Sequence, residues 1–423
     1  MHSQIKDLLS FLDASPTAVQ ASAQILKRLE AAGFAQLDER SAWNLKKGGK
    51  YYIQRADTAV IAFVMGSTDL ARTGFQLAAS HIDSPLLKLK PESLKSDGMV
   101  TRVGVEVYGG PIIATWTDRE LSIAGKALLR KNGKVTAHSV NLKDPVAIIP
   151  NAAIHLNREV NNGFVYNKQT HLQAILNTGK QERNPLLAAI AAELKAKPEQ
   201  IAELELYLYD PQPATLAGLD SSLVVSGRLD NLAMTHAILC GITSVGKPKN
   251  ACVAVFYDHE EIGSQTLQGA ASSLLAEALD RISLALALPR EQHYLALRSS
   301  FLISTDMAHA FHPAYPEKYE PSYAPAMNQG PVIKINANGR YTSTAESSER
   351  FLNLCEKAKA GCQKFLVRSD MPCGSTVGPV VSASLGIPAV DVGNPMWAMH
   401  SARETAGVED HLALIRVLAQ YFE

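Results

Sequence analysis

The chain has 423 residues, 46% of them hydrophobic, and its 41 basic side chains balance its 41 acidic ones. This length suits two domains or one large domain with an insertion, and the balanced charge argues against nucleic acid or a membrane surface as a partner. No apolar run reaches the roughly 18–20 residues of a membrane span, and the first residues do not resemble a secretory signal. The five cysteines form no Cys-x-x-Cys pair, which predicts reduced thiols in a cytoplasmic protein.

The first part of the chain predicts helices and then strands. A helical pattern covers residues 5–32, with a break at Ser15-Pro16, and Gly33 ends it. Short strands are expected over residues 51–54, 59–65 and 75–80.

After residue 91 the pattern changes to that of an antiparallel β ribbon. Residues 103–108 alternate between polar and apolar, and Asn132-Gly133 lies between two β-prone arms, which predicts a tight hairpin. One helix is expected in this region, with Asn184 as its cap and Pro185 in its first turn.

From Arg228 onward strands and helices alternate, which is typical of the α/β class with a largely parallel sheet. After a helix from Leu229 to about Ile242, the expected elements are a strand over 251–256, a helix over 270–286, a strand over 301–304, a helix over 344–363, a strand over 387–392 and a helix over 410–422. We therefore interpret residues 92–222 as an inserted β-rich domain. It interrupts a discontinuous catalytic domain that is formed by residues 1–91 and 223–423.

Polar residues of the kinds that bind metals follow several of these strands. Glu260 and Glu261 come just after the apolar strand over 251–256, and ligands bind at the carboxyl ends of central strands in open α/β sheets. Two adjacent glutamates cannot point the same way, so one can hold a metal while the other moves a proton. The other candidates are His81 with Asp83, Asp230, Asp306 and His400.

Imidazole and carboxylate groups without thiolates suit zinc, cobalt or manganese in a catalytic site. A pair of such ions lies about 3.5–4 Å apart and shares a bridging carboxylate. Most of these residues also have a structural alternative. The glutamates could form a solvated acidic loop, Asp230 could cap a helix, Asp306 could cap a turn, and His400 could be a hydrogen-bonded structural residue.

Several familiar catalytic motifs are absent from the sequence. The segment around Glu260 lacks the second histidine of His-Glu-x-x-His, and there is no Gly-x-Ser-x-Gly elbow. Residues 374–378, which begin with Gly374 and Ser375, lack the lysine of a phosphate loop, so we interpret them as a backbone-lined turn near the substrate.

Six segments in this order resemble the aspartyl aminopeptidase family of dinuclear zinc exopeptidases. They are His81-Ile82-Asp83-Ser84-Pro85, Gly227-Arg228-Leu229-Asp230-Asn231, Asp258-His259-Glu260-Glu261-Ile262-Gly263-Ser264, Ser304-Thr305-Asp306-Met307-Ala308-His309-Ala310, Asp370-Met371-Pro372-Cys373-Gly374-Ser375-Thr376 and Met399-His400-Ser401. The resemblance implies a mixed-sheet zinc-peptidase catalytic domain of the phosphorylase/hydrolase-like type, with an inserted β-rich dimerisation domain. It also implies a homododecamer built from dimers.

The resemblance further implies a site for two divalent metal ions, with zinc expected and cobalt or manganese as alternatives. Asp230 is implied to bridge the ions, Glu260 to act as general base, and Asp83 to orient a histidine ligand. The implied remaining ligands are His81 with Asp306 for one ion and Glu261 with His400 for the other.

Other residues are implied to act on the substrate, a peptide with a free N-terminus. His155 matches a histidine that the inserted domain offers to the neighbouring subunit's site. Lys334 and Tyr341 match the part that faces the substrate, although either could be a strand residue facing solvent. The family prefers acidic N-terminal residues, and we expect the same here. Two alternatives are a deacylase or carboxypeptidase on the same scaffold and a catalytically silent shell protein that binds cargo.

Overall fold

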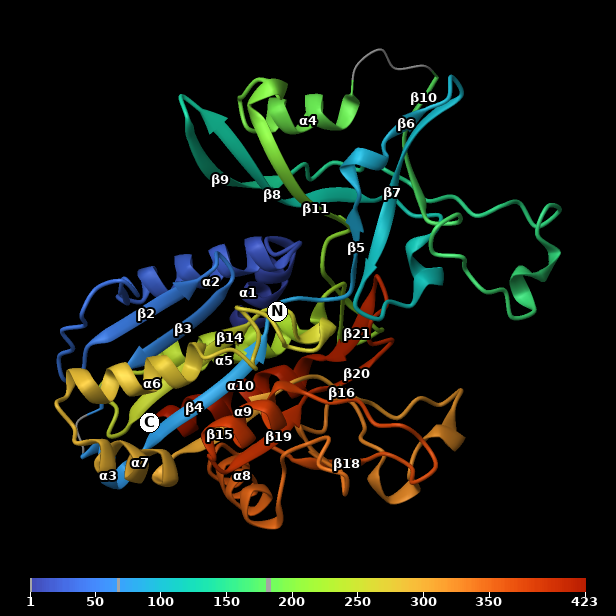
Figure 1. The fold of residues 1–423 in the computed structure, drawn as a ribbon. Helices are drawn as coiled ribbons and strands as arrows, with labels where there is room; N and C mark the ends of the chain where they lie inside the picture. The colour runs from blue at the N-terminus through green and yellow to red at the C-terminus, as the bar shows by residue number, and fades with distance from the viewer. Residues whose placement is uncertain (1, 67–68, 180–183) are drawn as a thin grey trace.

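A nine-stranded mixed sheet forms the centre of the larger, lower lobe in Figure 1. The computed structural model describes residues 2–66, 69–179 and 184–423. In spatial order the strands are β1 (Ala35–Gln36), β2 (Lys50–Arg55), β3 (Ala59–Val64), β14 (Ala251–Tyr257), β4 (Phe75–His81), β15 (Phe301–Thr305), β19 (Ala389–Gly393), β17 (Val332–Ile335) and β18 (Gln363–Leu366). The four central strands, from β14 to β19, run parallel, so their carboxyl ends meet at one edge of the sheet.

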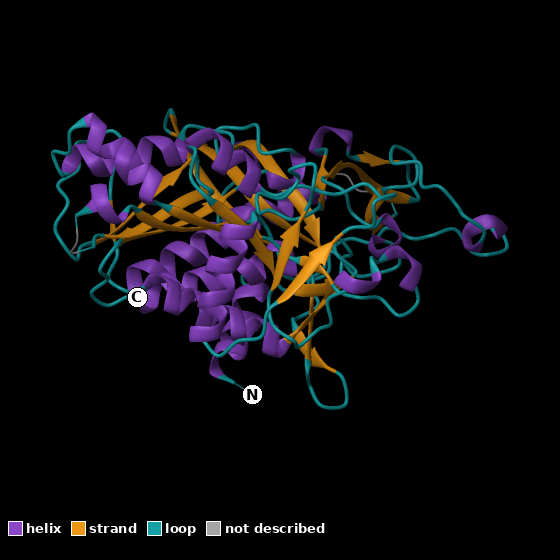
Figure 2. Ribbon diagram, turned by 90° about the horizontal axis from the view of Figure 1, so that it is seen from below, coloured by secondary structure: helices purple, strands orange, loops and turns teal. Residues whose placement is uncertain are grey.

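Helices cover both faces of this sheet (Figure 2) because its central strands are apolar on both sides. In β3, for example, successive buried residues belong alternately to two separate cores. The first core is closed by α1 (Ser3–Asp13), α2 (Ala18–Ala31), α5 (Leu229–Ser244), α8 (Ala345–Lys357) and α10 (Val408–Phe422). The second is closed by α3 (Leu70–Thr73), α6 (Leu274–Ala285), α7 (Arg290–Ser299) and α9 (Val377–Leu385).

The upper lobe is built on a seven-stranded antiparallel sheet. Its strands are β10 (Gln173–Thr178), β7 (Val100–Tyr108), β5 (Leu86–Leu89), β11 (Ile201–Tyr209), β8 (Ser122–Lys131) and β9 (Lys134–Asn141), with β6 (Lys95–Ser96) paired to β7. Helix α4 (Pro185–Glu193) packs on its core. This sheet begins at Leu86 and ends at Tyr209, so both of its ends lie earlier in the chain than the ends of the expected 92–222 segment.

A third, five-stranded sheet lies where the chain returns to the lower lobe. It consists of β12 (Thr215–Ala217), β13 (Leu223–Ser226), β21 (Glu404–Gly407), β20 (Pro395–Trp397) and β16 (Ala308–His309). Because β13 pairs with β21, the segment that precedes α5 lies beside the segment that follows His400.

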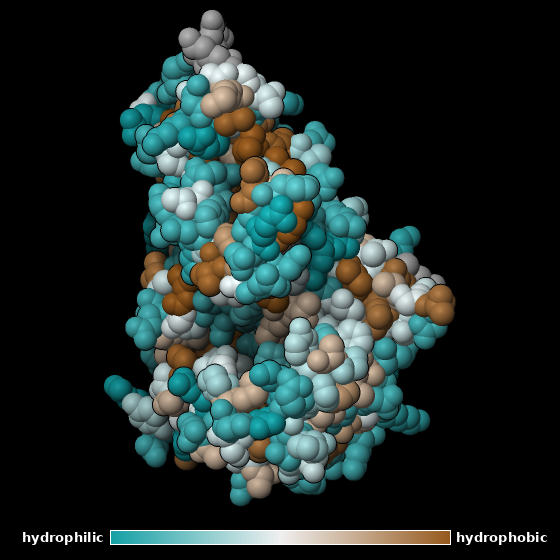
Figure 3. Space-filling view, turned by 90° about the vertical axis from the view of Figure 1, so that its right-hand side faces the viewer, coloured by the Kyte–Doolittle hydropathy of each residue, from teal (hydrophilic) through white to brown (hydrophobic). Residues whose placement is uncertain are grey.

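Residues 150–171 form a projecting arm, the green loop at the right of Figure 1, which contains the short 3-10 helix Arg158–Asn161. Large apolar side chains are exposed on it: Ile154 is 47% exposed, Leu156 83% and Val165 82%. Figure 3, which views the molecule from the side of the arm, shows further apolar areas on the upper lobe and a recess between the two lobes.

Most expected elements are confirmed, including the α/β class with a mixed sheet. Asn132 and Gly133 form the two-residue turn between β8 and β9, and both have positive φ, as a hairpin turn of this kind requires. Asn184 caps α4 by accepting a hydrogen bond from the backbone of Leu187 at 3.1 Å.

The helices of the C-terminal half differ from the expectations in two ways. The helix expected over 344–363 is too long, because α8 ends at Lys357 and residues 363–366 pair with β17 as strand β18. Helix α9, which begins at Val377, was not predicted at all. Its glycine and proline lie in the first turn, where they do not break a helix but do obscure the pattern.

Candidate active site

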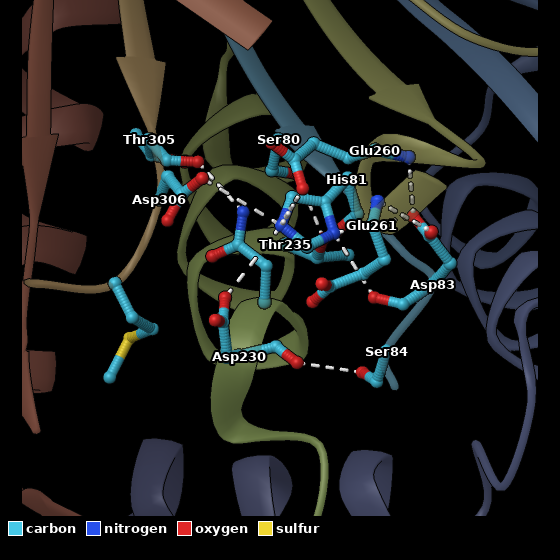
Figure 4. Close-up of polar contacts among 12 residues, drawn as sticks. Ser80, His81, Asp83, Ser84, Asp230, Thr235, Glu260, Glu261, Thr305 and Asp306 are labelled. Carbon is cyan, nitrogen blue, oxygen red and sulfur yellow. Dashed lines mark hydrogen bonds and ion pairs between the residues drawn. The ribbon is translucent and has the colours of Figure 1, made fainter. Parts of the chain in front are cut away.

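Parallel strands bring the expected residues to one place (Figure 4). His81 is the last residue of β4 and pairs in register with Tyr257, the last residue of β14, so the glutamates that follow β14 lie beside it. Asp306 directly follows β15, the other neighbour of β4. The side chains of His81, Glu261, Asp306 and Asp230 point toward one another in Figure 4.

The converging groups form two trios that share Asp230. In the first, His81 Nε2 lies 3.7 Å from Asp230 Oδ1 and 3.8 Å from Asp306 Oδ2. In the second, His400 Nε2 lies 3.4 Å from Asp230 Oδ2 and 3.4 Å from Glu261 Oε1. Within each trio the three atoms lie within 4.8 Å of one another. Asp230 therefore presents one carboxylate oxygen to each trio.

Both histidines are held in the tautomer that leaves Nε2 free to bind an ion. His81 Nδ1 lies 3.0 Å from the backbone carbonyl of Asp83, and His400 Nδ1 lies 3.0 Å from that of Gly110. A backbone carbonyl only accepts, so each Nδ1 must carry a proton, and Nε2 is the ring nitrogen that faces the carboxylates and that an ion could take. Histidines that bind metals are fixed in this way.

The carboxylates lack the partners that a purely structural role would provide. Asp230 Oδ1 and Glu261 Oε1 are buried and have no hydrogen-bond partner among the described residues. The helix-cap alternative for Asp230 is wrong, because among the described residues Oδ1 has no hydrogen-bond partner and Oδ2 faces His400 rather than a backbone N–H of the helix. The solvated-loop alternative is also wrong, since the Glu261 side chain is only 5% exposed and that of Glu260 18%.

Added positive charge would stabilise the buried carboxylates of this pocket. Burial raises the pKa of Glu260 to about 7 and holds that of Glu261 well above its usual range. Burial lowers the pKa of His400, but the hydrogen bond to Asp230 and the negative charges of the nearby carboxylates together outweigh burial and raise the pKa to about 10. Without ions, the buried carboxylates thus raise the affinity of neighbouring groups for protons. Divalent cations would supply the positive charge that these protons provide. The donor set, imidazole and carboxylate without thiolate, suits zinc.

Asp83 organises the turn that carries the two glutamates. Its Oδ1 accepts the backbone N–H of Glu260 and its Oδ2 that of Glu261, each at 3.1 Å. Tyr108, from the sheet of the upper lobe, donates its hydroxyl to Oδ2 at 2.7 Å. Oδ1 also lies 3.3 Å from His81 Nδ1. One carboxylate therefore orients the histidine and both glutamates.

The sequence analysis missed Glu404, which is 1% exposed. Its Oε1 accepts the backbone N–H of His400 at 2.7 Å, and its Oε2 accepts that of Asp230 at 3.1 Å. It thus links two members of the second trio that lie far apart in the sequence. The only signal was an acidic residue four positions after His400, and no known pattern marks it.

Of the four residues expected near the substrate, two lie inside the protein and two lie in an exposed segment. Lys334 and Tyr341 do not face solvent, since they are 3% and 6% exposed. Lys334 Nζ donates to Asp306 Oδ1 at 3.2 Å and to the backbone carbonyl of Met307 at 2.9 Å, and it lies 5.2 Å from the centre of the Tyr341 ring.

Gly374 and Ser375 lie in the exposed segment before α9, where Ser375 donates to the carbonyl of Arg340 at 3.3 Å. His155 is exposed on the projecting arm. Among the described residues, no hydrogen bond or ion pair joins it to the site of its own chain.

Known proteins resemble this chain over nearly its whole length. A family model described as aminopeptidase I zinc metalloprotease (M18) matches residues 11–422. The probable M18 family aminopeptidase 2 of Stutzerimonas stutzeri (strain A1501) is 41% identical over 422 residues, which are 98% of this chain and 97% of that protein.

Solved structures agree with this similarity. A chain in the cryo-EM structure of the Ape4 and Nbr1 complex has a TM-score of 0.95 and 36% identity, and the match covers 99% of this chain and 85% of that one. A yeast mApe1 dodecamer has a TM-score of 0.86 and 25% identity, and the match covers 99% of this chain and 95% of that one.

In the described part of the chain, none of the helices has both the length and the apolar character of a membrane span.

Proposed function

Since the chain belongs to the aminopeptidase I family of zinc metalloproteases (M18) and is a metallo-aminopeptidase, we propose that its two trios bind two metal ions. We also propose that Glu260 is the general base. Asp230 would be shared by both ions, and the remaining ligands would be His81 with Asp306 for one ion and Glu261 with His400 for the other. The observation that carries this proposal is that the two oxygens of Asp230 face different histidines. Zinc is the expected metal, with cobalt or manganese as alternatives.

Ions bound there supply Lewis acidity and lower the pKa of a water molecule to about 7. The protein supplies the proton acceptor. Glu260 is suited to this task because its side chain is more open to the pocket than that of Glu261, and because its pKa, raised by burial to about 7, is near the pH at which a base must work. Asp83 holds the backbones of both glutamates by accepting their N–H groups.

Glu404 is expected to support metal binding without touching the metal. The variant Glu404→Gln replaces one of the two carboxylate acceptors by an amide N–H, which cannot accept from Asp230 or His400. We expect the affinity for metal to fall roughly 10- to 100-fold, as it does when other supporting residues are lost, while kcat at saturating metal changes little. Titration of the chelated enzyme with zinc measures both quantities.

Glu409→Gln is the matched control, because Glu409 is exposed and lies five residues farther along the chain. An unchanged metal affinity in Glu404→Gln, equal to that of this control, would remove Glu404 from the account.

We propose that the substrate is a peptide with a free N-terminus, preferably an acidic one. Lys334, Tyr341 and the Gly374–Ser375 segment form the pocket for the first side chain. Lys334 supports this because a buried cation can bind a carboxylate, and two of its three N–H groups are engaged by the protein.

The expected result is a higher kcat/KM for Asp- and Glu-p-nitroanilide than for Leu-p-nitroanilide, with no cleavage of N-acetylated Asp-p-nitroanilide. Lys334→Met should reduce the acidic substrates more than the leucine one. Equal losses would confine Lys334 to holding Asp306, and faster cleavage of the leucine substrate by the native enzyme would exclude an acidic preference. Cleavage of the acetylated substrate would favour a deacylase or related amidohydrolase.

We also propose that the chain divides into a catalytic part, residues 1–91 and 223–423, and a β-rich dimerisation part, residues 92–222, and that dimers assemble into a homododecamer. The exposed apolar side chains of the projecting arm support an interface there. In this arrangement His155 reaches the site of the neighbouring subunit, where it can stabilise negative charge on the substrate carbonyl.

Mixing subunits tests this role of His155. His155→Ala and Glu260→Gln assemblies should each be nearly inactive. Subunits co-expressed from both variants should regain part of the activity, because some active sites then combine an intact Glu260 with an intact His155 from a neighbour. Activity that is the same in the mixture as in the separate variants would contradict a role across the interface.

A further inference from the structure

A second cluster of metal-binding side chains lies between α1 and α5, outside the active site. His236 and Cys240 are four residues apart on α5 and therefore share one face of that helix. Asp7 of α1 faces them, and its Oδ2 lies 3.0 Å from His236 Nε2. Cys240 Sγ lies 3.7 Å from the same nitrogen. The three ligand atoms lie within 4.8 Å of one another.

The distances from His236 Nε2 to the other two ligand atoms are close to the edges of a tetrahedral zinc site. With zinc bonds of about 2.0 Å to nitrogen and oxygen and about 2.3 Å to sulfur, neighbouring ligands lie about 3.3 Å apart for nitrogen and oxygen and about 3.5 Å apart for nitrogen and sulfur. The observed 3.0 and 3.7 Å lie close to those values, but Sγ also lies 3.8 Å from His236 Nδ1, so the Cys240 side chain would have to turn toward the Nε2 side to share an ion with it. Three protein ligands leave a fourth position for water.

The surroundings already hold the histidine as metal sites hold their ligands. His236 is fully buried, and its Nδ1 lies 2.9 Å from Nε2 of His411 on α10, which is 2% exposed. With an ion on Nε2, Nδ1 keeps the proton and donates it to His411, which is the supporting contact that metal-binding histidines make. Phe11 packs near the His236 ring, with the ring centres 5.7 Å apart.

Asp7 gives the cluster access to solvent. Its side chain is half exposed, so an ion can reach the buried histidine from this side. Its other oxygen is held by Arg28 at 3.1 Å, which leaves Oδ2 directed at the cluster. The active-site chemistry uses none of these residues.

We propose that Asp7, His236 and Cys240 form a third metal site, for zinc or a similar borderline divalent ion, which ties α1 to α5. The alternative is a hydrogen-bonded chain from Asp7 through His236 to His411 that binds no ion. The two differ in the role of Cys240, because only a bound ion makes its sulfur a ligand and removes the thiol proton.

Cobalt(II) separates the two, because cobalt bound by a thiolate shows a near-ultraviolet charge-transfer band and the proposed active-site ligands include no sulfur. The full-length enzyme saturated with cobalt should show this band. Cys240→Ser should lose the band and one equivalent of bound cobalt, with aminopeptidase activity retained. Asp7→Asn, a change at a half-exposed position, should weaken cobalt binding at the site, so that the band saturates only at a higher cobalt concentration.

Cys362→Ser is the matched control, since Cys362 is also partly buried, and it should keep both the band and the cobalt count. A native enzyme without the band, or a band that survives in Cys240→Ser, would overturn the proposal. Because the readout is the loss of one sulfur-bound equivalent, it does not depend on how many ions the active site holds.

Discussion

Replacing Glu260 by glutamine should lower kcat roughly 10²- to 10⁴-fold and leave the metal content unchanged. Glutamine has nearly the same shape but cannot take up a proton. The backbone N–H of residue 260 still donates to Asp83, so the turn that carries Glu261 should keep its conformation. The measurements are steady-state kinetics and metal analysis on one preparation.

Glu261→Gln is the informative comparison, because the two residues are neighbours and differ only in their proposed roles. It should lose metal as well as activity, since Glu261 lies 3.4 Å from His400 in the second trio. Full activity in Glu260→Gln would disprove its role as the base. Metal loss in Glu260→Gln, with retention in Glu261→Gln, would mean that the roles are exchanged.

Replacing Asp230 by asparagine should reduce binding of both ions and lower kcat/KM by roughly 10³-fold or more, because Lewis-acid stabilisation is worth several kcal/mol. An amide offers one oxygen and no negative charge, so it cannot bridge two cations. Metal analysis after extensive dialysis, with kinetics on the same sample, measures the effect.

Asp306→Asn provides the matched test, because Asp306 belongs to the first trio only. It should lose one ion and keep the other. If Asp230→Asn kept two tightly bound ions, or behaved like Asp306→Asn, Asp230 would not be the bridging ligand.

The sequence was sufficient to predict which side chains converge wherever each of them comes at the end of a strand. His81, Glu261 and Asp306 follow apolar strands that can be identified from their composition, and the parallel pairing of β14, β4 and β15 then brings them to one edge. The unpaired oxygen of Asp230 could not be predicted in this way, because it depends on the irregular start of α5, where Asp230 has non-helical φ and ψ, and on which groups pack around it.

Contacts between distant segments could not be predicted from the sequence. Tyr108 reaches Asp83 from the upper lobe, the carbonyl of Gly110 accepts a hydrogen bond from His400, and Glu404 joins Asp230 to His400 beside the β13–β21 pairing. Each depends on how the lobes and sheets pack, and a local pattern carries no information about that. The position of Lys334 against Asp306 was hidden for the same reason.

The most direct test of the two-metal account is the metal content and aminopeptidase activity of one sample, before and after chelation. The account predicts two ions per chain with imidazole and carboxylate ligands, in addition to any ion at Cys240. Activity should be lost on chelation and restored by zinc, cobalt or manganese. A folded enzyme that binds one active-site ion at most, or that keeps its activity after every ion is removed, would contradict the account.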